Sequence, residues 1–485
     1  MDWRGTTVEV RLGAPGHGGF CVARHEGRVL FVRHGLPGEL VRAIVTEDRG
    51  GSFCRADAIE ILEASADRVD PACPVSGPGG AGCCDFTHAT PAAQRGLKHS
   101  VVAEQLLRLA DWEPDFEVEV IPAPMSGVSA PLKAGADGSV SGVPAAAGAP
   151  SPSVSGTTRD AAADRAGSGP AVSGAPAGVA PAAAGGWRSR VRLVVDAQGR
   201  AGVHRYRSTD VIPDLRCPQP MAGAMEGIAE RTWKPGADLV IAVDGDGMRH
   251  LLELSPVVQS GRSKRGGNGF RRGSDRNSTV ARRAAAHSPR VEKVFDGTGR
   301  AVQYVGGRRW ELSATGFWQP HAGAAQCYSD VVAEWSDAAP GALTWDLYCG
   351  VGVFAARLAG QVGPAGGVHG VEFARTAVTE GKSALRDLPW VDLRAERVEQ
   401  WIVEQPPTAP DVVVLDPPRA GAGKEVISAL TERTPRRIIH IGCDPASFAR
   451  DLGLYRNAGY EPAALRVFDA FPGTHHVECI ALLER

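Results

Sequence analysis

Four short apolar runs in the last third of the chain each end in a turn or a polar residue. They lie at residues 343–347, 367–371, 412–415 and 437–441. A glycine turn follows the first, and Glu372, Asp416 and Gly442-Cys443 follow the other three. Strands that alternate with helical segments are typical of an open α/β sheet, whose site lies along the carboxyl ends of its strands. The pattern therefore predicts such a sheet, with a site at that edge.

The first 65 residues show a different pattern, in which short apolar-polar alternations are separated by glycines. Val8-Glu9-Val10 and residues 28–32 are examples. This spacing predicts a small antiparallel β-barrel over residues 1–66. Residues 94–110 instead have helical spacing, which predicts a buried helix face. Its apolar positions are Leu97, Val101, Val102, Leu106, Leu107 and Ala110.

Two compositionally biased segments interrupt the region between these parts. Residues from about 123 to 186 are almost entirely Ala, Gly, Pro and Ser, and residues 258–290 are rich in Arg, Gly and Ser. The first has too few apolar side chains to offset the entropy of ordering, which predicts a disordered insertion. The second is either a basic loop that favours phosphate contacts or a solvating spacer. We place an α+β central domain, with both insertions, over residues 67–305.

Size and charge restrict the class of protein. A chain of 485 residues is expected to form two or three domains, and its net charge of −2 provides no global basic field. The N-terminus lacks an apolar signal core, and no apolar stretch approaches the ~18 residues of a membrane span. We therefore expect a cytoplasmic protein without membrane contact, and a monomer.

The glycine turn at 346–352 is the first candidate binding site. Such a turn between strand and helix lets the backbone approach a nucleotide-like ligand, and a carboxylate after the next strand holds ribose hydroxyls. Glu372 lies twenty residues beyond Gly352, which is suitable spacing. The segment lacks the full dinucleotide glycine fingerprint and a Walker lysine, which disfavours NAD and ATP.

Several motifs together resemble one enzyme family. The run DLYCGVGVFAARLA looks like the S-adenosylmethionine motif of class I methyltransferases, and GHGGFCVARHEGRVLFVRHGLPGELVRA looks like a TRAM domain. The motifs at 416–419 (DPPR), 442–445 (GCDP) and 471–478 (FPGTHHVE) follow in order. With these motifs the chain resembles the TRAM-domain RNA 5-methyluridine methyltransferases, which act on tRNA or 23S rRNA. The likeness extends over nearly the whole chain outside the two insertions.

The resemblance implies a Rossmann-like methyltransferase domain over residues 306–485, S-adenosylmethionine as cofactor and RNA as partner. It implies that Cys443 is the nucleophile and Glu478 the general base. The implied cofactor contacts are Gln319, Tyr348, Glu372 and Asp416.

The chemistry needs these residue types, because carbon 5 of uracil attacks a sulfonium methyl only after a thiolate adds to carbon 6. A carboxylate then removes the carbon 5 proton. We expect a helix starting near Pro445 to help lower the pKa of the Cys443 thiol. Asp444, where the family commonly has asparagine, opposes that effect. Residues 396–399 also depart from the family pattern, which leaves the adenine contact unassigned.

The resemblance also implies a 4Fe–4S cluster held by four cysteines. Clustered cysteines in a cytosolic chain favour metal over disulfide. The candidate ligands are Cys73, Cys83, Cys84 and Cys217. The loop departs from the family because Ala81 stands at the middle ligand position and two of the cysteines are adjacent. Thiols left in a loop that has lost its cluster are the alternative.

Other functions stay open at this point. Cytosine methylation at carbon 5 uses the same addition chemistry, but its usual Thr-Cys or Pro-Cys signature is absent. Amino-group methylation needs no cysteine and uses an Asn-Pro-Pro-aromatic motif. An RNA-binding protein on a decayed methyltransferase scaffold is the non-enzymatic alternative. The arginines of the barrel either face RNA or form a solvated surface; they are Arg11, Arg24, Arg33 and Arg42.

Overall fold

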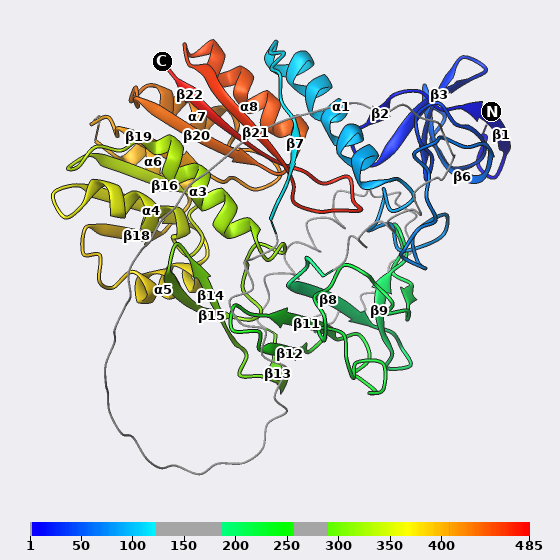
Figure 1. Ribbon diagram of the computed structural model, residues 1–485, viewed down its shortest axis with the longest axis horizontal. Helices are drawn as coiled ribbons and strands as arrows, with labels where there is room; N and C mark the ends of the chain where they lie inside the picture. Colours follow the sequence, from blue (N-terminus) through cyan, green and yellow to red (C-terminus); the bar gives the residue numbers. More distant parts are fainter. Residues whose placement is uncertain (1, 123–185, 257–289, 407) are drawn as a thin grey trace, which may run out of the picture. The chain divides into compact units, whose positions relative to one another are not determined.

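The computed structural model describes residues 2–122, 186–256, 290–406 and 408–485 (Figure 1). The two predicted insertions therefore lie, except for their terminal residues 186 and 290, outside the described residues. Within these described ranges, none of the helices has the length and apolar character that a membrane span requires.

The N-terminal segment forms a six-stranded sheet in the order β1-β5-β6-β4-β3-β2. Its strands are β1 (Thr7–Arg11), β2 (Pro15–Gly16), β3 (Phe20–His25), β4 (Arg28–Arg33), β5 (Leu40–Asp48) and β6 (Phe53–Glu63). Neighbours pair antiparallel, apart from the parallel pair β4 and β6. Alternate side chains such as Val8 and Val10 are buried in one apolar core. The predicted alternation is confirmed.

The central part contains a second six-stranded sheet, in the order β10-β9-β8-β11-β12-β13. Its strands are β8 (Arg190–Val195), β9 (Ala201–His204), β10 (Val211–Ile212), β11 (Asp238–Val243), β12 (Arg249–Leu254) and β13 (Glu292–Asp296). A hairpin of β14 (Arg300–Val305) and β15 (Arg308–Ser313) follows.

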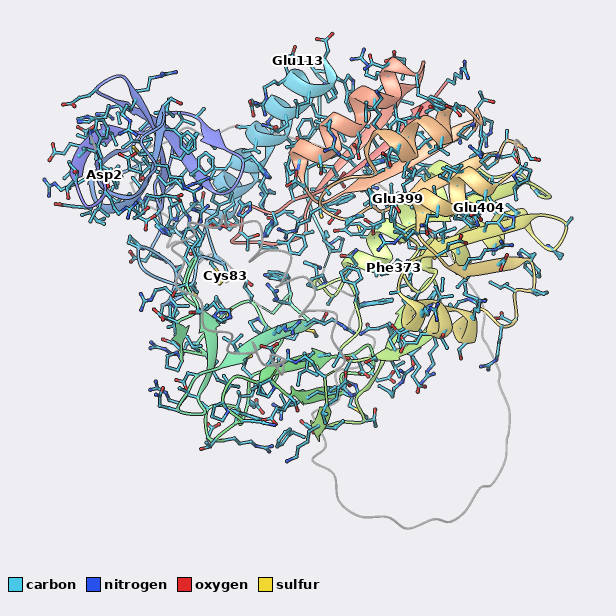
Figure 2. The ribbon with its side chains drawn as sticks, turned by 180° about the vertical axis from the view of Figure 1, so that it is seen from behind. Asp2, Cys83, Glu113, Phe373, Glu399 and Glu404 are labelled. Atoms are coloured by element: carbon cyan, nitrogen blue, oxygen red, sulfur yellow. The ribbon has the colours of Figure 1, made fainter. Side chains whose placement is uncertain are left out.

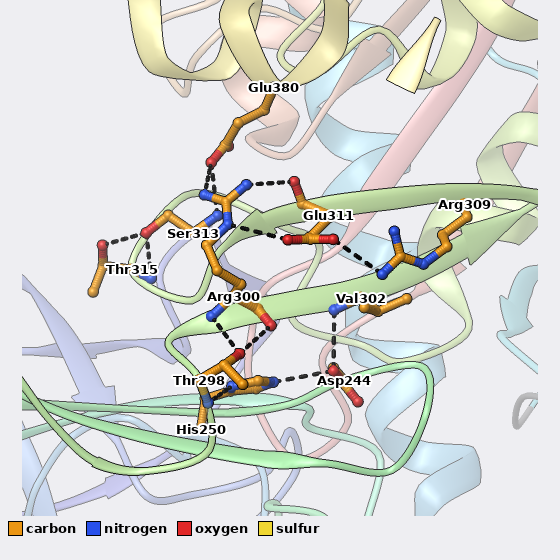
Figure 3. Close-up of polar contacts among 10 residues, drawn as sticks. All are labelled: Asp244, His250, Thr298, Arg300, Val302, Arg309, Glu311, Ser313, Thr315 and Glu380. Atoms are coloured by element: carbon orange, nitrogen blue, oxygen red, sulfur yellow. Dashed lines mark hydrogen bonds and ion pairs between the residues drawn. The ribbon is translucent and has the colours of Figure 1, made fainter. Parts of the chain in front are cut away.

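Polar contacts attach this hairpin on two sides (Figure 3). The carboxylate of Asp244 accepts from the Val302 backbone N–H at 3.0 Å, which joins β14 to the central part. The carboxylate of Glu380, on helix α5 (Arg375–Ala384), accepts from Arg300 Nη1 at 2.6 Å and from the Ser313 backbone N–H at 2.7 Å. The loop that follows Ser313 is thereby held at its start.

The C-terminal sheet has eight strands in the order β18-β17-β16-β19-β20-β22-β21-β7. They include β16 (Leu343–Leu347), β17 (Gly367–Glu372), β18 (Val391–Ala395), β19 (Val412–Leu415), β20 (Arg437–Gly442), β21 (Glu461–Asp469) and β22 (Glu478–Glu484). Strands β16 to β20 pair in parallel, and β22 runs antiparallel to β20 and β21. The four predicted apolar runs coincide with β16, β17, β19 and β20, which confirms the α/β prediction.

Helices cover both faces of this sheet (Figure 1). Besides α5 they are α3 (Ala324–Ser336), α4 (Val353–Val362), α6 (Val398–Glu404), α7 (Gly423–Thr431) and α8 (Pro445–Asn457). Alternate residues of β19 point to opposite faces, so Val412 and Val414 join one core and Val413 and Leu415 the other. Because both of its faces are buried, β19 has a continuous apolar sequence, which is the run seen at residues 412–415.

Helix α1 (Pro91–Ala110) and strand β7 (Val118–Val120) also pack on this sheet, although they lie within the predicted central range 67–305. β7 pairs in parallel with β21 at the sheet edge (Figure 1). α1 buries the predicted positions except Leu107, which is 51% exposed, so that part of the helix prediction was wrong. Leu107 lies off the face that α1 presents to α8 and β7.

Candidate active site

A cavity of about 1250 Å³ lies at the carboxyl ends of the parallel strands. Its lining includes all six residues predicted for catalysis and cofactor binding: Gln319, Tyr348, Glu372, Asp416, Cys443 and Glu478. They come from five separate strands or their ends and from the loop after the β14–β15 hairpin. The parallel strands bring Tyr348, Glu372, Asp416 and Cys443 to one edge, as their spacing predicted. Glu478 reaches the same edge because β22 starts there and runs antiparallel to β20.

The turn after β16 presents bare backbone to this cavity. Gly350 has a φ of +54°, and no atom lies within 4 Å of the place where a Cβ would stand. Its N–H donates to Glu372 Oε2 at 3.3 Å, and the Ala374 N–H donates to Glu372 Oε1 at 2.7 Å. The Glu372 carboxylate is therefore fixed beside a backbone that a ligand can approach closely.

An aromatic and charged wall lies next to that turn. The Arg397 guanidinium lies 4.5 Å from the centroid of the Phe373 ring, and the Tyr348 hydroxyl donates to Glu399 Oε1 at 3.5 Å. Figure 2 labels Phe373 and Glu399, which line the cavity with Arg397. Phe373 was not selected from the sequence, because a single aromatic residue after a strand has no distinctive pattern.

Cys443 lies between β20 and α8, on the cavity lining. α8 begins at Pro445, as predicted, and the Asp444 carboxylate caps it by accepting from the Ser447 N–H at 3.0 Å. Burial nevertheless raises the pKa of the Cys443 thiol to about 12; the charge of Glu478 adds to this effect and Arg419 opposes it. The net pKa of this thiol is therefore raised although a helix begins at Pro445, because burial is the largest influence on it.

Two carboxyl groups accompany this thiol. Burial, together with the charge of Glu372, raises the pKa of Asp416 to about 7. Burial and the charge of Asp416 raise the pKa of Glu478, which is 3% exposed, well above its ordinary value; Arg419 opposes this shift. Since neighbouring carboxylates disfavour ionisation of both, we expect the cavity to retain a proton near neutral pH.

Comparisons with known proteins agree with this geometry. The TRAM domain family matches residues 3–58, and the tRNA (uracil-5-)-methyltransferase family matches residues 408–485. An uncharacterised RNA methyltransferase of Streptomyces avermitilis is 39% identical, over 99% of this chain and 98% of its own length. The chain belongs to the RNA uracil-5-methyltransferase family. The resemblance found in the sequence is thereby confirmed.

Two further relatives of this RNA methyltransferase bear on its substrate class and fold. A 23S rRNA (uracil(1939)-C(5))-methyltransferase of Alkalilimnicola ehrlichii is 28% identical over 98% of this chain and 96% of its own. The Pyrococcus abyssi tRNA (uracil-54, C5)-methyltransferase, solved with S-adenosyl-L-homocysteine, has a TM-score of 0.59 at 16% identity. That likeness covers 98% of this chain and 99% of the other, and it shows a shared fold.

The TRAM barrel of this methyltransferase contacts the turn that contains Cys443. His17 Nε2, from the turn before β3, lies 3.0 Å from Asp444 Oδ2. Asp85 lies between Arg33 of the barrel, at 2.7 Å, and His475 of the loop before Glu478, at 2.5 Å. No local sequence signal links these partners, because they are distant in the chain.

Ion pairs also bear on whether the four barrel arginines face RNA. Arg11 pairs with Glu63, Arg33 with Asp85, and Arg42 with Glu9 and Glu60. Arg24 has no ion pair with any residue in the described ranges. Three of the four arginines thus form ion pairs within the protein, which favours a structural role for them over contact with RNA.

The cysteine loop of the methyltransferase does not have the arrangement expected of a 4Fe–4S site. Cys83 and Cys84 have their Sγ atoms 3.8 Å apart, and Gln219 Nε2 donates to Cys84 Sγ at 3.4 Å. A hydrogen bond from Cys84 lowers the pKa of Cys73 to about 6, whereas burial raises that of Cys217 to about 11. Cubane ligands each bind a separate iron, so two sulfurs in mutual contact do not fit. Across the described ranges, no group of three or more His, Cys, Asp or Glu is placed to hold a metal ion, and the cluster prediction is not supported.

Proposed function

We propose that this enzyme transfers the methyl group of S-adenosylmethionine to carbon 5 of a uridine in structured RNA, either tRNA or rRNA. The observation that supports it is the presence of Cys443, Glu478 and Asp416 on the same cavity lining as the glycine turn. Family membership supports the reaction class, and the cavity supplies each group that the chemistry needs.

S-Adenosylmethionine fits the residues at the turn. The open backbone of Gly350, with no atom within 4 Å of a Cβ position, leaves room for close approach of a ligand. Glu372 has a fixed carboxylate for hydroxyl groups, and Gln319, Tyr348 and Asp416 complete the set that would hold the cofactor. When bound, the cofactor supplies an electrophilic methyl group.

Cys443 begins the reaction by forming a bond from Sγ to carbon 6 of uracil. The electron pair of the carbon 5–carbon 6 double bond moves toward O4 and makes carbon 5 nucleophilic, so that it accepts the methyl group. Glu478 then takes the carbon 5 proton, the double bond reforms and the sulfur–carbon bond breaks. The raised pKa of Glu478 makes its ionised form a stronger base.

The Cys443 thiol must first lose its own proton. With a pKa near 12 it is protonated at neutral pH, so an acceptor is required. Asp416, whose pKa is about 7, is ionised in a substantial fraction of molecules at that pH. Its charge is near enough to raise the pKa of the Cys443 thiol, so it is also near enough to be considered as the proton acceptor. We assign it this role in addition to its cofactor contact.

The first test uses RNA labelled with tritium at carbon 5 of uridine and prepared from cells that lack the enzyme. Wild-type protein with S-adenosylmethionine is expected to release tritium. Cys443→Ala should release none and form no adduct. Glu478→Gln should also release none, but should accumulate a protein–RNA adduct that survives a denaturing gel, because elimination requires loss of the carbon 5 proton.

Cys327→Ala is the matched control, because Cys327 is half-buried on α3 and does not line the cavity. Its activity should equal that of the wild type. Release from cytidine-labelled RNA would favour cytosine methylation instead. An absence of release from both tRNA and rRNA would favour the binding-protein alternative.

A further inference from the structure

Tyr328 is a buried residue on the cavity lining that no motif identifies. It lies on α3, is 0% exposed, and packs its ring against Phe468 with centroids 5.7 Å apart. The same lining includes Cys443, Asp416 and Glu478. Tyr328 therefore belongs to the wall of the cavity in which the chemistry is proposed to occur.

The hydroxyl of Tyr328 has no hydrogen-bond partner among the described residues. Two other tyrosines that are also 0% exposed are partnered: the Tyr460 hydroxyl donates to the Pro435 carbonyl at 2.8 Å, and the Tyr455 hydroxyl lies 3.3 Å from His440 Nδ1. A buried hydroxyl without a partner lowers stability, so native proteins rarely retain one without a function. Tyr328 thus has an unused donor at the cavity wall.

The surroundings of this hydroxyl indicate which ligand it meets. Glu478, Asp416 and Cys443 line the same cavity. Together with Cys327 they are close enough to the phenol to act on it electrostatically. Burial and these groups raise the pKa of Tyr328 well above its ordinary value, so the phenol keeps its proton. A protonated phenol beside the nucleophile and base is a donor for the substrate base rather than for the cofactor.

We propose that Tyr328 donates a hydrogen bond to O4 of the target uracil. This inference rests on the proposed function. When Cys443 Sγ bonds to carbon 6, the displaced electron pair places negative charge on O4, and a fixed donor there stabilises that charge as in an oxyanion hole. Tyr328 keeps its proton throughout. The charge on O4 is lost when carbon 5 takes the methyl group, returns when Glu478 removes the carbon 5 proton, and is lost again when the sulfur–carbon bond breaks.

Tyr328→Phe tests this with little change in packing, and Tyr460→Phe is the matched control with the same substitution at equal burial. Total RNA containing 5-fluorouridine, which traps the adduct, reports the addition step; tritium-labelled total RNA reports turnover. Tyr328→Phe should lower kcat and the rate of adduct formation on the order of 100-fold, with KM for S-adenosylmethionine unchanged. Its Tm should equal or exceed that of the wild type, because an unpartnered hydroxyl is removed. Tyr460→Phe should lower Tm and leave kcat unchanged.

Three results overturn the proposal. The first is an unchanged kcat in Tyr328→Phe alongside an active wild type, which leaves the proposed function intact. The second is adduct formation at the wild-type rate followed by slow release of tritium. That result means that the Tyr328 hydroxyl donates to Glu478 and not to O4. The third is a loss of Tm as large as that of Tyr460→Phe, which means that the hydroxyl is already bonded in the free protein. A wild type inactive on all RNA removes the proposed function, and this inference with it.

Discussion

Asp346 lies directly beneath the glycine turn and is 0% exposed. Its Oδ2 accepts from the Ala355 N–H at 2.7 Å, and its Oδ1 has no partner among the described residues. Burial raises its pKa from 3.8 to about 8, and the charges of Asp416 and Glu372 add to the effect. The carboxyl therefore anchors the start of α4 mostly in its protonated form at neutral pH.

This raised pKa predicts a pH dependence of stability. The folded protein keeps a proton on Asp346 that the unfolded chain releases, so the contribution to stability is fully present below about pH 4 and is lost as pH rises through about 8. Asp346→Asn cannot ionise and should escape this loss. Calorimetric Tm values should show the variant gaining on the wild type as pH increases over that range. A Tm difference that stays constant with pH would contradict the prediction.

At the same scale, the sequence indicated which residues line the cavity but not how their groups ionise. Cys443 and Asp416 could be selected because each follows a strand in a recognisable motif, and Glu478 because it closes the motif at 471–478. The pKa of Cys443 could not be predicted, because it depends on burial and on the charge of Glu478 across the cavity. Tyr328 was missed for a related reason: on α3 it has the same spacing as a core residue.

Elements with strong periodicity were predictable from the sequence, and those defined by a distant partner were not. β19 is apolar along its whole length because both of its faces are buried, and this sets it apart from its surroundings. β7 has three residues and is specified mainly by its pairing with β21, so no local pattern indicates it. α1 was predicted as a helix, but its docking against α8 depends on contacts between segments far apart in the chain.

α1 also anchors the loop that leads to Glu478. Lys98 Nζ is buried against the Asp469 carboxylate and lies 3.1 Å from the Phe471 carbonyl oxygen. The Gly473 N–H donates to Gln94 Oε1 of the same helix at 2.7 Å. These bonds fix the backbone of the loop just before Glu478, the proposed general base.

Lys98→Met should therefore destabilise the protein by roughly 3–5 kcal/mol, because it leaves the buried carboxylate of Asp469 without a counter-charge. The free energy of urea unfolding measures this loss. Adding Asp469→Asn should recover part of it. Arg108→Met, which removes an exposed ion pair with Glu104 on the same helix, should cost less than about 1 kcal/mol. Equal losses at both positions would argue against the anchoring role.

For the molecule as a whole, the main feature is that His17 of the TRAM barrel contacts Asp444, in the turn of the proposed nucleophile Cys443. Burial alone would raise the pKa of Asp444, but hydrogen bonds with His17 and the Ser447 N–H lower it to about 2. Asp444 is thus ionised and held from both sides. From the sequence, we expected the negative charge of Asp444 to oppose activation of the thiol. In the structure this carboxylate contacts His17 of the barrel and accepts from the Ser447 N–H at the start of α8.

His17→Ala tests whether this contact positions Cys443. The pair is partly exposed, so its loss should change stability by about 0–1 kcal/mol. Catalysis is more sensitive to small displacements of a reacting atom, and we expect kcat to fall roughly tenfold with KM for S-adenosylmethionine unchanged. His17→Gln, which retains a donor, should restore most of the rate. His25→Ala serves as control, because His25 contacts Trp3 and Glu26 within the barrel. If His17→Ala instead raises KM for RNA and leaves kcat unchanged, the barrel turn binds RNA and does not position the nucleophile.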